Sequence, residues 1–149
     1  MDGSELRQRI LAAFASVPRP SRDEIAPHIC MECAELADDL APYVAAEIPD
    51  ESFQRHVWDM PLLSAEAKHY YFPAWLIRGL DDSEPWLSDA VSAVLNTLKD
   101  LEHRWDPAQP YSREQWLVFQ EWLSYIEKAG DAIDSDDIAE ARERVGIEL

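Results

Sequence analysis

Glycine and threonine are scarce in this chain of 149 residues, which has four glycines and a single threonine, Thr97. A phosphate-cradling loop needs closely spaced glycines, and β-strands favour β-branched residues such as threonine. No segment shows the alternation of apolar and polar residues that is typical of a half-buried strand. The sequence therefore predicts an all-α protein without a nucleotide-binding loop.

Basic residues are also few: 13 Lys and Arg stand against 30 Asp and Glu, which gives a formal net charge of −17. Nucleic acids and anionic membrane surfaces are bound by clusters of Lys and Arg, so neither is expected as a ligand. A basic protein would instead be attracted, and its association would be accelerated. The charge therefore favours a basic protein partner.

Long apolar runs are absent as well. No window approaches the ~18 to 20 apolar residues of a membrane span, and no basic segment precedes an apolar run at the N-terminus, so we expect a cytoplasmic protein. Nevertheless 47% of the residues are hydrophobic, including six Trp, five Tyr and four Phe, which is too many for a disordered chain. We expect residues 1–149 to form a single helical domain with a packed core.

Enzyme signatures are missing too. The chain contains no Gly-x-Ser-x-Gly, His-Glu-x-x-His or Walker motif. Its carboxylates are too numerous for an acid–base pair to be singled out. We therefore expect a protein without enzymatic activity, cofactor or catalytic residues.

The apolar pattern predicts a compact bundle of about five to seven helices around a central, aromatic-rich helix at residues 113–128. A capping box of Ser112 and Gln115 begins that helix, and apolar residues cover almost its whole circumference. Further helices are expected after Ser4, at residues 30–40, 50–58 and 65–72, after the Ser83-Glu-Pro segment, and at residues 135–144.

The helix after Ser64 contains Pro73, where we expect it to continue or kink. Gly79 then follows as a candidate cap in the left-handed conformation, which is common where helices end.

Both cysteines lie in the segment "HICMEC", residues 28–33. His28, Cys30 and Cys33 could bind zinc, with His56, His69, His103 or a carboxylate as the fourth ligand. Zinc sites normally show a second paired module, which this chain lacks, so metal binding is kept as an alternative. A redox pair is disfavoured by the nearby acidic residues, which oppose a thiolate. The favoured interpretation is that two small apolar side chains anchor a helix to the core.

Acidic residues cluster instead after the cysteines. Residues 23–59 contain ten acidic residues and one basic residue, Arg55, and a second acidic run covers residues 127–140. Like charges on one helix face repel, so selection for stability alone would intersperse lysines there. Trp58 or Trp86 could act as an apolar anchor within such a surface. The predicted partner-binding residues are Glu32, Glu35, Asp38, Asp39, Asp50, Glu51 and Trp58.

The segments "HICMEC" and, at residues 62–76, "LLSAEAKHYYFPAWL" resemble a family of small bacterial proteins of unknown function with Cys-x-Glu-Cys and LLSxEAxxYYxPA motifs. The resemblance covers the middle third of the chain and implies no catalytic residues. In size, helical pattern and acidity the chain also resembles bacterial toxin-immunity proteins, which cover a basic toxin active site.

These patterns together predict an acidic inhibitor of the immunity or antitoxin kind, which neutralises a basic toxin by covering its active site. A small zinc protein built on His28, Cys30 and Cys33, with His69 as a further candidate ligand, is the alternative from a different class. A DNA-mimicking inhibitor is a third hypothesis and differs from the first only in its partner.

Overall fold

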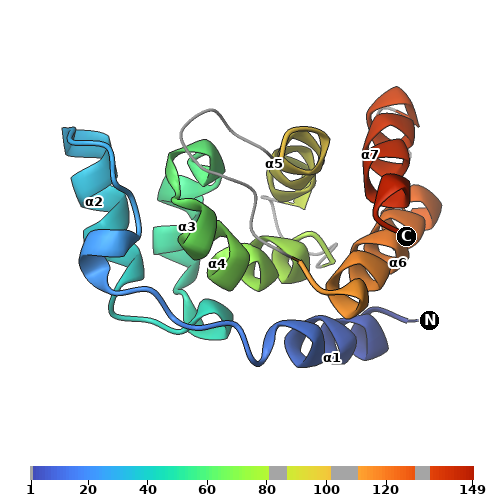
Figure 1. The fold of residues 1–149 in the computed structure, drawn as a ribbon, viewed down its shortest axis with the longest axis horizontal. Helices are drawn as coiled ribbons and strands as arrows, with labels where there is room; N and C mark the ends of the chain where they lie inside the picture. The colour runs from blue at the N-terminus through green and yellow to red at the C-terminus, as the bar shows by residue number, and fades with distance from the viewer. Residues whose placement is uncertain (1, 81–86, 102–110, 130–134) are drawn as a thin grey trace.

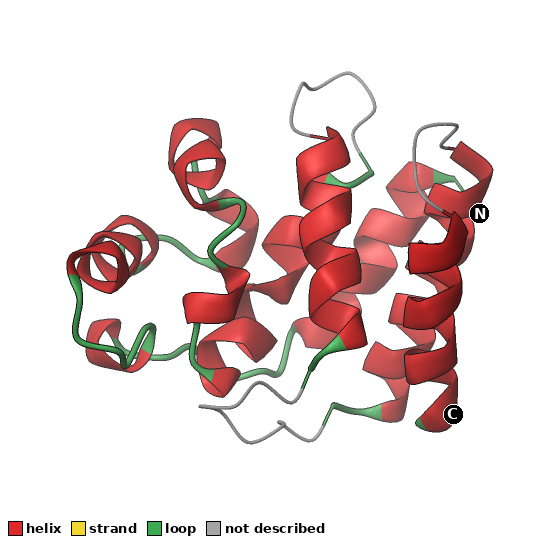
Figure 2. Ribbon diagram, turned by 90° about the horizontal axis from the view of Figure 1, so that it is seen from above, coloured by secondary structure: helices red, strands yellow, loops and turns green. Residues whose placement is uncertain are grey.

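All regular secondary structure in the part of the chain that the structure describes is helical, as expected for an all-α protein (Figure 2). The structure is a computed structural model and describes residues 2–80, 87–101, 111–129 and 135–149. These residues form seven α-helices: α1 (Gly3–Phe14), α2 (Met31–Leu40), α3 (Asp50–His56), α4 (Ala65–Arg78), α5 (Leu87–Lys99), α6 (Arg113–Ala129) and α7 (Ser135–Ile147). Three short 3₁₀ helices, η1 (Arg22–Glu24), η2 (Ala45–Glu47) and η3 (Met60–Leu62), connect the first four.

Side-chain caps fix several helix starts. The hydroxyl of Ser64 accepts a hydrogen bond from the backbone N–H of Ala67 (3.0 Å), which confirms the predicted N-cap of α4. The capping box of α6 is also confirmed, because Ser112 and Gln115 exchange bonds of 2.9 and 3.1 Å between side chain and backbone. Helix α1 begins earlier than expected, because Asp2 rather than Ser4 caps its first turn.

Helices α4 and α6 together hold the core. Helix α4 runs between the α2 end of the molecule and the end formed by α6 and α7 (Figure 1). The indole N–H of Trp122 on α6 donates to the carbonyl of Leu76 on α4 (2.9 Å), and Trp75 donates to the carbonyl of Val57 (2.9 Å). Both indoles are fully buried, so these bonds satisfy polar groups that would otherwise destabilise the core.

The expected aromatic-rich helix is α6, which packs on α1 and α7. Its Phe119 is fully buried, and the ring centroids of Phe119 and Phe72 of α4 lie 4.8 Å apart. Phe14 of α1 and Tyr111 complete this aromatic cluster, at 5.9 and 5.6 Å from Phe119. The compact all-α bundle with a buried aromatic cluster is therefore confirmed, and α4 and α6 both contribute to that cluster.

Gly79 does not adopt the left-handed conformation that its place at a helix end suggested. Its φ of −68° and ψ of −12° are right-handed, so the expectation was wrong. The physical reason for glycine is close packing, because a Cβ atom at this position would lie 2.9 Å from Cζ2 of Trp122. The indole is held by its own hydrogen bond and buried position, so it has little freedom to move aside.

Two further helix boundaries differ slightly from the prediction, because α3 ends at His56 rather than at residue 58 and α7 continues through Gly146. Helix α4 continues through Pro73 to Arg78, which is one of the two outcomes expected for it. The expected cap at Ser83-Glu-Pro and the residues Trp86 and His103 lie outside the described part of the chain. No helix in the described ranges is long and apolar enough to cross a membrane.

Candidate functional site

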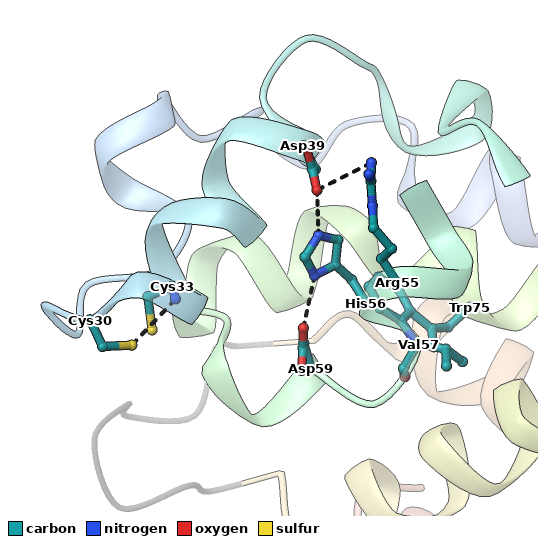
Figure 3. Close-up of polar contacts among 8 residues, drawn as sticks. All are labelled: Cys30, Cys33, Asp39, Arg55, His56, Val57, Asp59 and Trp75. Atoms are coloured by element: carbon teal, nitrogen blue, oxygen red, sulfur yellow. Dashed lines mark hydrogen bonds and ion pairs between the residues drawn. The ribbon is translucent and has the colours of Figure 1, made fainter. Parts of the chain in front are cut away.

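The two cysteines lie together at the N-terminus of α2 (Figure 3). Cys30 is the N-cap residue, and its sulfur accepts a hydrogen bond from the backbone N–H of Cys33 (3.3 Å). The ring nitrogen of His28 and the two sulfur atoms all lie within 4.8 Å of one another. We call these three residues the thiol–histidine group. They can supply one imidazole and two thiolates to a single ion.

The two thiols differ in surroundings. Cys33 is buried, as expected of an anchor to the core, whereas Cys30 is partly exposed. Burial raises the pKa of Cys33 to about 11, and the charges of Glu32 and Asp59 contribute to the rise. Hydrogen bonds with Cys33 and then with His28 lower the pKa of Cys30.

His69, the fourth residue considered as a metal ligand, lies elsewhere. Its Nε2 is 2.9 Å from the side-chain oxygen of Gln115, and its ring contacts Phe14 and Tyr111. Burial lowers the pKa of His69, which favours a neutral ring that donates its Nε2–H to Gln115. His69 is therefore a packing residue of the aromatic cluster and does not join the thiol–histidine group.

His56 joins a buried polar network that sequence reasoning missed. Its Nδ1 lies 2.8 Å from Asp59 Oδ2 and its Nε2 lies 2.6 Å from Asp39 Oδ2 (Figure 3). Carboxylate oxygens at both ring nitrogens favour a ring in which both nitrogens carry a proton and donate. The hydrogen bond with Asp59 is the main cause of a raised His56 pKa, and the bond with Asp39 adds to it. This network connects α2, α3 and the turn before η3.

The predicted partner-binding acids fall into two groups. Asp38 pairs with Arg22 at 2.8 Å, Asp39 belongs to the His56 network, and Asp50 pairs with Arg78 at 2.5 Å. These three side chains have structural partners. The other three, Glu32, Glu35 and Glu51, are exposed and form no ion pair within the described residues.

Two apolar side chains beside these free acids are strongly exposed. Ile29 is 98% and Met31 is 78% exposed, on either side of Cys30. Helical steps of four place Met31 and Glu35 on one face of α2. We call Ile29, Met31, Glu32 and Glu35 the α2 tip. In the sequence, the signal for this surface is the alternation of Ile29 and Met31 with the thiols within HICMEC.

The proposed anchor Trp58 is 52% exposed. It lines a small pocket of about 90 Å³ with η3 and with Thr97 and Asp100 near the end of α5. A larger cavity of about 430 Å³ lies between α1 and α6, at the opposite end of the molecule from α2 (Figure 1). Neither cavity contains residues of the thiol–histidine group.

Within the described residues, neighbouring cations pair with acids of the second acidic run. Lys99 lies 2.7 Å from Asp137 and 3.8 Å from Glu140, and Arg142 pairs with Glu127 at 2.5 Å. Carboxylates without partners are therefore more characteristic of the α2 tip than of α7. The two acidic runs looked alike in the sequence, and only the fold separates them.

Comparison of the chain with protein-family models, with curated proteins and with solved structures finds no match. The resemblance to a bacterial family therefore stays a prediction. Any function must be argued from the geometry of the α2 end itself.

Proposed function

We propose that this protein is an acidic, protein-binding inhibitor of the immunity kind, and that the α2 tip contacts its basic partner. Ile29 and Met31 would be buried in the interface, while Glu32 and Glu35 would attract and orient the partner. The observation that carries the proposal is the placement of two exposed apolar side chains beside two acids that form no ion pair with any residue the structure describes.

General features of protein interfaces support this assignment. Apolar side chains at the centre of an interface supply most of the binding free energy, and methionine is enriched there. Charges around that centre act mainly on the association rate and on the choice of partner. Pairing with basic groups would also relieve the repulsion between Glu32 and Glu35, which lie three residues apart on α2.

The first partner to test is the protein encoded next to this one. Its production should arrest cell growth, and co-production of this chain should restore it. For the purified pair, the association rate should fall as salt is raised, because screening shortens the range of charge attraction. A DNA mimic would be recognised by a nucleic-acid-binding partner from which DNA displaces this protein.

Single substitutions locate the surface. Ile29→Ser should weaken binding by about 30-fold, the effect of a typical interface hot spot, without loss of stability because Ile29 is exposed. Glu35→Lys should slow association. Glu143→Lys is the matched control, because Glu143 is an exposed glutamate of α7 that forms no ion pair in the described residues. Normal binding by both α2 variants would refute this assignment.

A further inference from the structure

The thiol–histidine group has the residue types and the clustering of a metal site. We propose that His28, Cys30 and Cys33 bind one Zn²⁺ ion and leave a fourth coordination position for water or an external ligand. This inference is independent of the proposed inhibitory function, because it concerns different atoms of the α2 end and needs no partner protein.

The geometry requires only a small contraction. The three ligand atoms lie within 4.8 Å of one another. Zn–S bonds of about 2.3 Å and Zn–N bonds of about 2.0 Å in a tetrahedron place neighbouring ligand atoms roughly 3.5–3.8 Å apart. His28 is exposed, so rotation of its side chain can move the ring nitrogen by the necessary distance of about 1 Å without disturbing the core. Cys30 and Cys33 are already linked through the N–H···S hydrogen bond.

The charges around the group favour a cation over a free thiolate or a redox pair. Glu32 and Asp59 act on Cys33 and oppose the negative charge of a bare thiolate. The same carboxylates attract a divalent cation, whose charge would compensate both thiolates. Thiolate and imidazole ligands select zinc over magnesium or calcium, which prefer oxygen. When the ion binds, each thiol releases its proton to solvent as its sulfur–zinc bond forms.

Zinc would also fix the shape of the α2 tip. His28 precedes the helix, whereas Cys33 lies in its first turn, so one ion would cross-link the loop to the helix. Ile29 and Met31 lie between the ligands in sequence and project into solvent. Three protein ligands are typical of sites that keep an exchangeable position, whereas closed structural sites have four.

The experiment uses the full-length, reduced protein without an affinity tag. Zinc binding is measured by competition with a chromophoric chelator, and Co²⁺ is added separately as a spectroscopic probe. We expect about one ion per chain. The Co²⁺ form should show a thiolate-to-cobalt charge-transfer band and visible absorption bands as strong as those of tetrahedral Co²⁺. Loss of one ligand should weaken zinc binding by more than about 100-fold. Loss of a residue that only hydrogen-bonds to a metal ligand already weakens metal binding by up to about that factor.

Three variants remove one ligand each: His28→Gln, Cys30→Ser and Cys33→Ser. The control is Ala34→Ser, which adds the same hydroxyl at an exposed neighbouring position and keeps all three ligands. His28→Gln leaves the core intact and gives a result even if Cys33→Ser fails to fold. Zinc affinity lost in the ligand variants and kept in the control supports the site. No stoichiometric binding by the reduced protein, or binding unchanged by His28→Gln, overturns it.

Discussion

The two ends of this molecule are stabilised in different ways. The α4–α6 region is held by large aromatic side chains, with Trp75, Phe72, Phe119 and Trp122 fully buried. At the α2–α3 end the buried ring of Phe53 is joined by the polar network of His56, and the surface has exposed apolar side chains and acids without ion pairs in the described residues. Residues that contribute little to stability are those available for binding, which is consistent with the proposal that the α2 end contacts a partner.

The largest difference in unfolding free energy should appear between alanine substitutions of two tryptophans. Trp75→Ala removes a fully buried indole and leaves the Val57 carbonyl without its donor, so we expect a loss of about 3–5 kcal/mol of unfolding free energy. Trp58→Ala, at a half-exposed position, should cost about 1 kcal/mol or less. Urea unfolding measures both. Equal losses would mean that the aromatic core does not dominate stability.

Replacing two of the glycines by alanine should change the unfolding free energy in opposite directions. A methyl group at Gly79 would lie 2.9 Å from Trp122, so Gly79→Ala should destabilise by about 1–3 kcal/mol. Gly146 is helical with open space around it, so Gly146→Ala should stabilise by about 0.5–1 kcal/mol. Thermal unfolding of the two variants gives the comparison, and a neutral Gly79→Ala would contradict the close contact.

The buried His56 and the partly buried His69 should give opposite pH dependences of stability. His56 has a raised pKa in the fold, so its contribution is complete below the unfolded value of about 6.5 and is lost as pH rises through the folded pKa. His69 has a lowered pKa, so stability is lost as pH falls from about 6.5 through the folded value. The unfolding free energy, measured from about pH 5 to about pH 9, should therefore decline both below and above about pH 6.5.

The variant His56→Gln assigns the alkaline side of that profile. It removes the imidazolium between Asp39 and Asp59, so it should lower stability at acidic pH and flatten the decline above about pH 6.5. This substitution leaves Arg55, which lies 3.4 Å from Asp39, in place. An alkaline decline as steep as that of the unaltered protein would show that His56 is not its source.

The smallest effect on stability is expected at the α2 tip. Glu35→Lys replaces repulsion from Glu32 and Asp39 by attraction, so we expect a gain of about 0.2–0.5 kcal/mol per pair. The same variant should slow association with a basic partner. A gain in stability together with a loss of binding, measured by unfolding and by binding kinetics, would separate function from folding at this end. A clear loss of stability would show that Glu35 has a structural role.

Local sequence patterns predicted the helices well. The caps at Ser64 and at Ser112 with Gln115 use hydrogen bonds between residues three apart, so the sequence contains all the information for them. The face of α1 with Leu6, Ile10 and Phe14 was equally readable from helical spacing. Gly79 was misread because the atom that excludes a side chain belongs to Trp122, 43 positions along the chain.

The candidate site was readable in part. His28, Cys30 and Cys33 are close in sequence, and a helix start is enough to bring their ligand atoms together. The partnership of His56 with Asp39 and Asp59 was not foreseen, because its bond to Asp39 depends on how α2 packs on α3. The same packing divided the predicted acids into paired and free residues, a distinction that composition cannot supply.

The sequence by itself determined the all-α class, most helix boundaries and the acidic character of the protein, because these depend on local hydrogen bonds, periodicity and total charge. Only the tertiary structure decided which acids in the described residues remain without ion pairs, why residue 79 is glycine, and in which direction the pKa of His56 shifts. Those properties arise from atoms that are distant in the chain and adjacent in space.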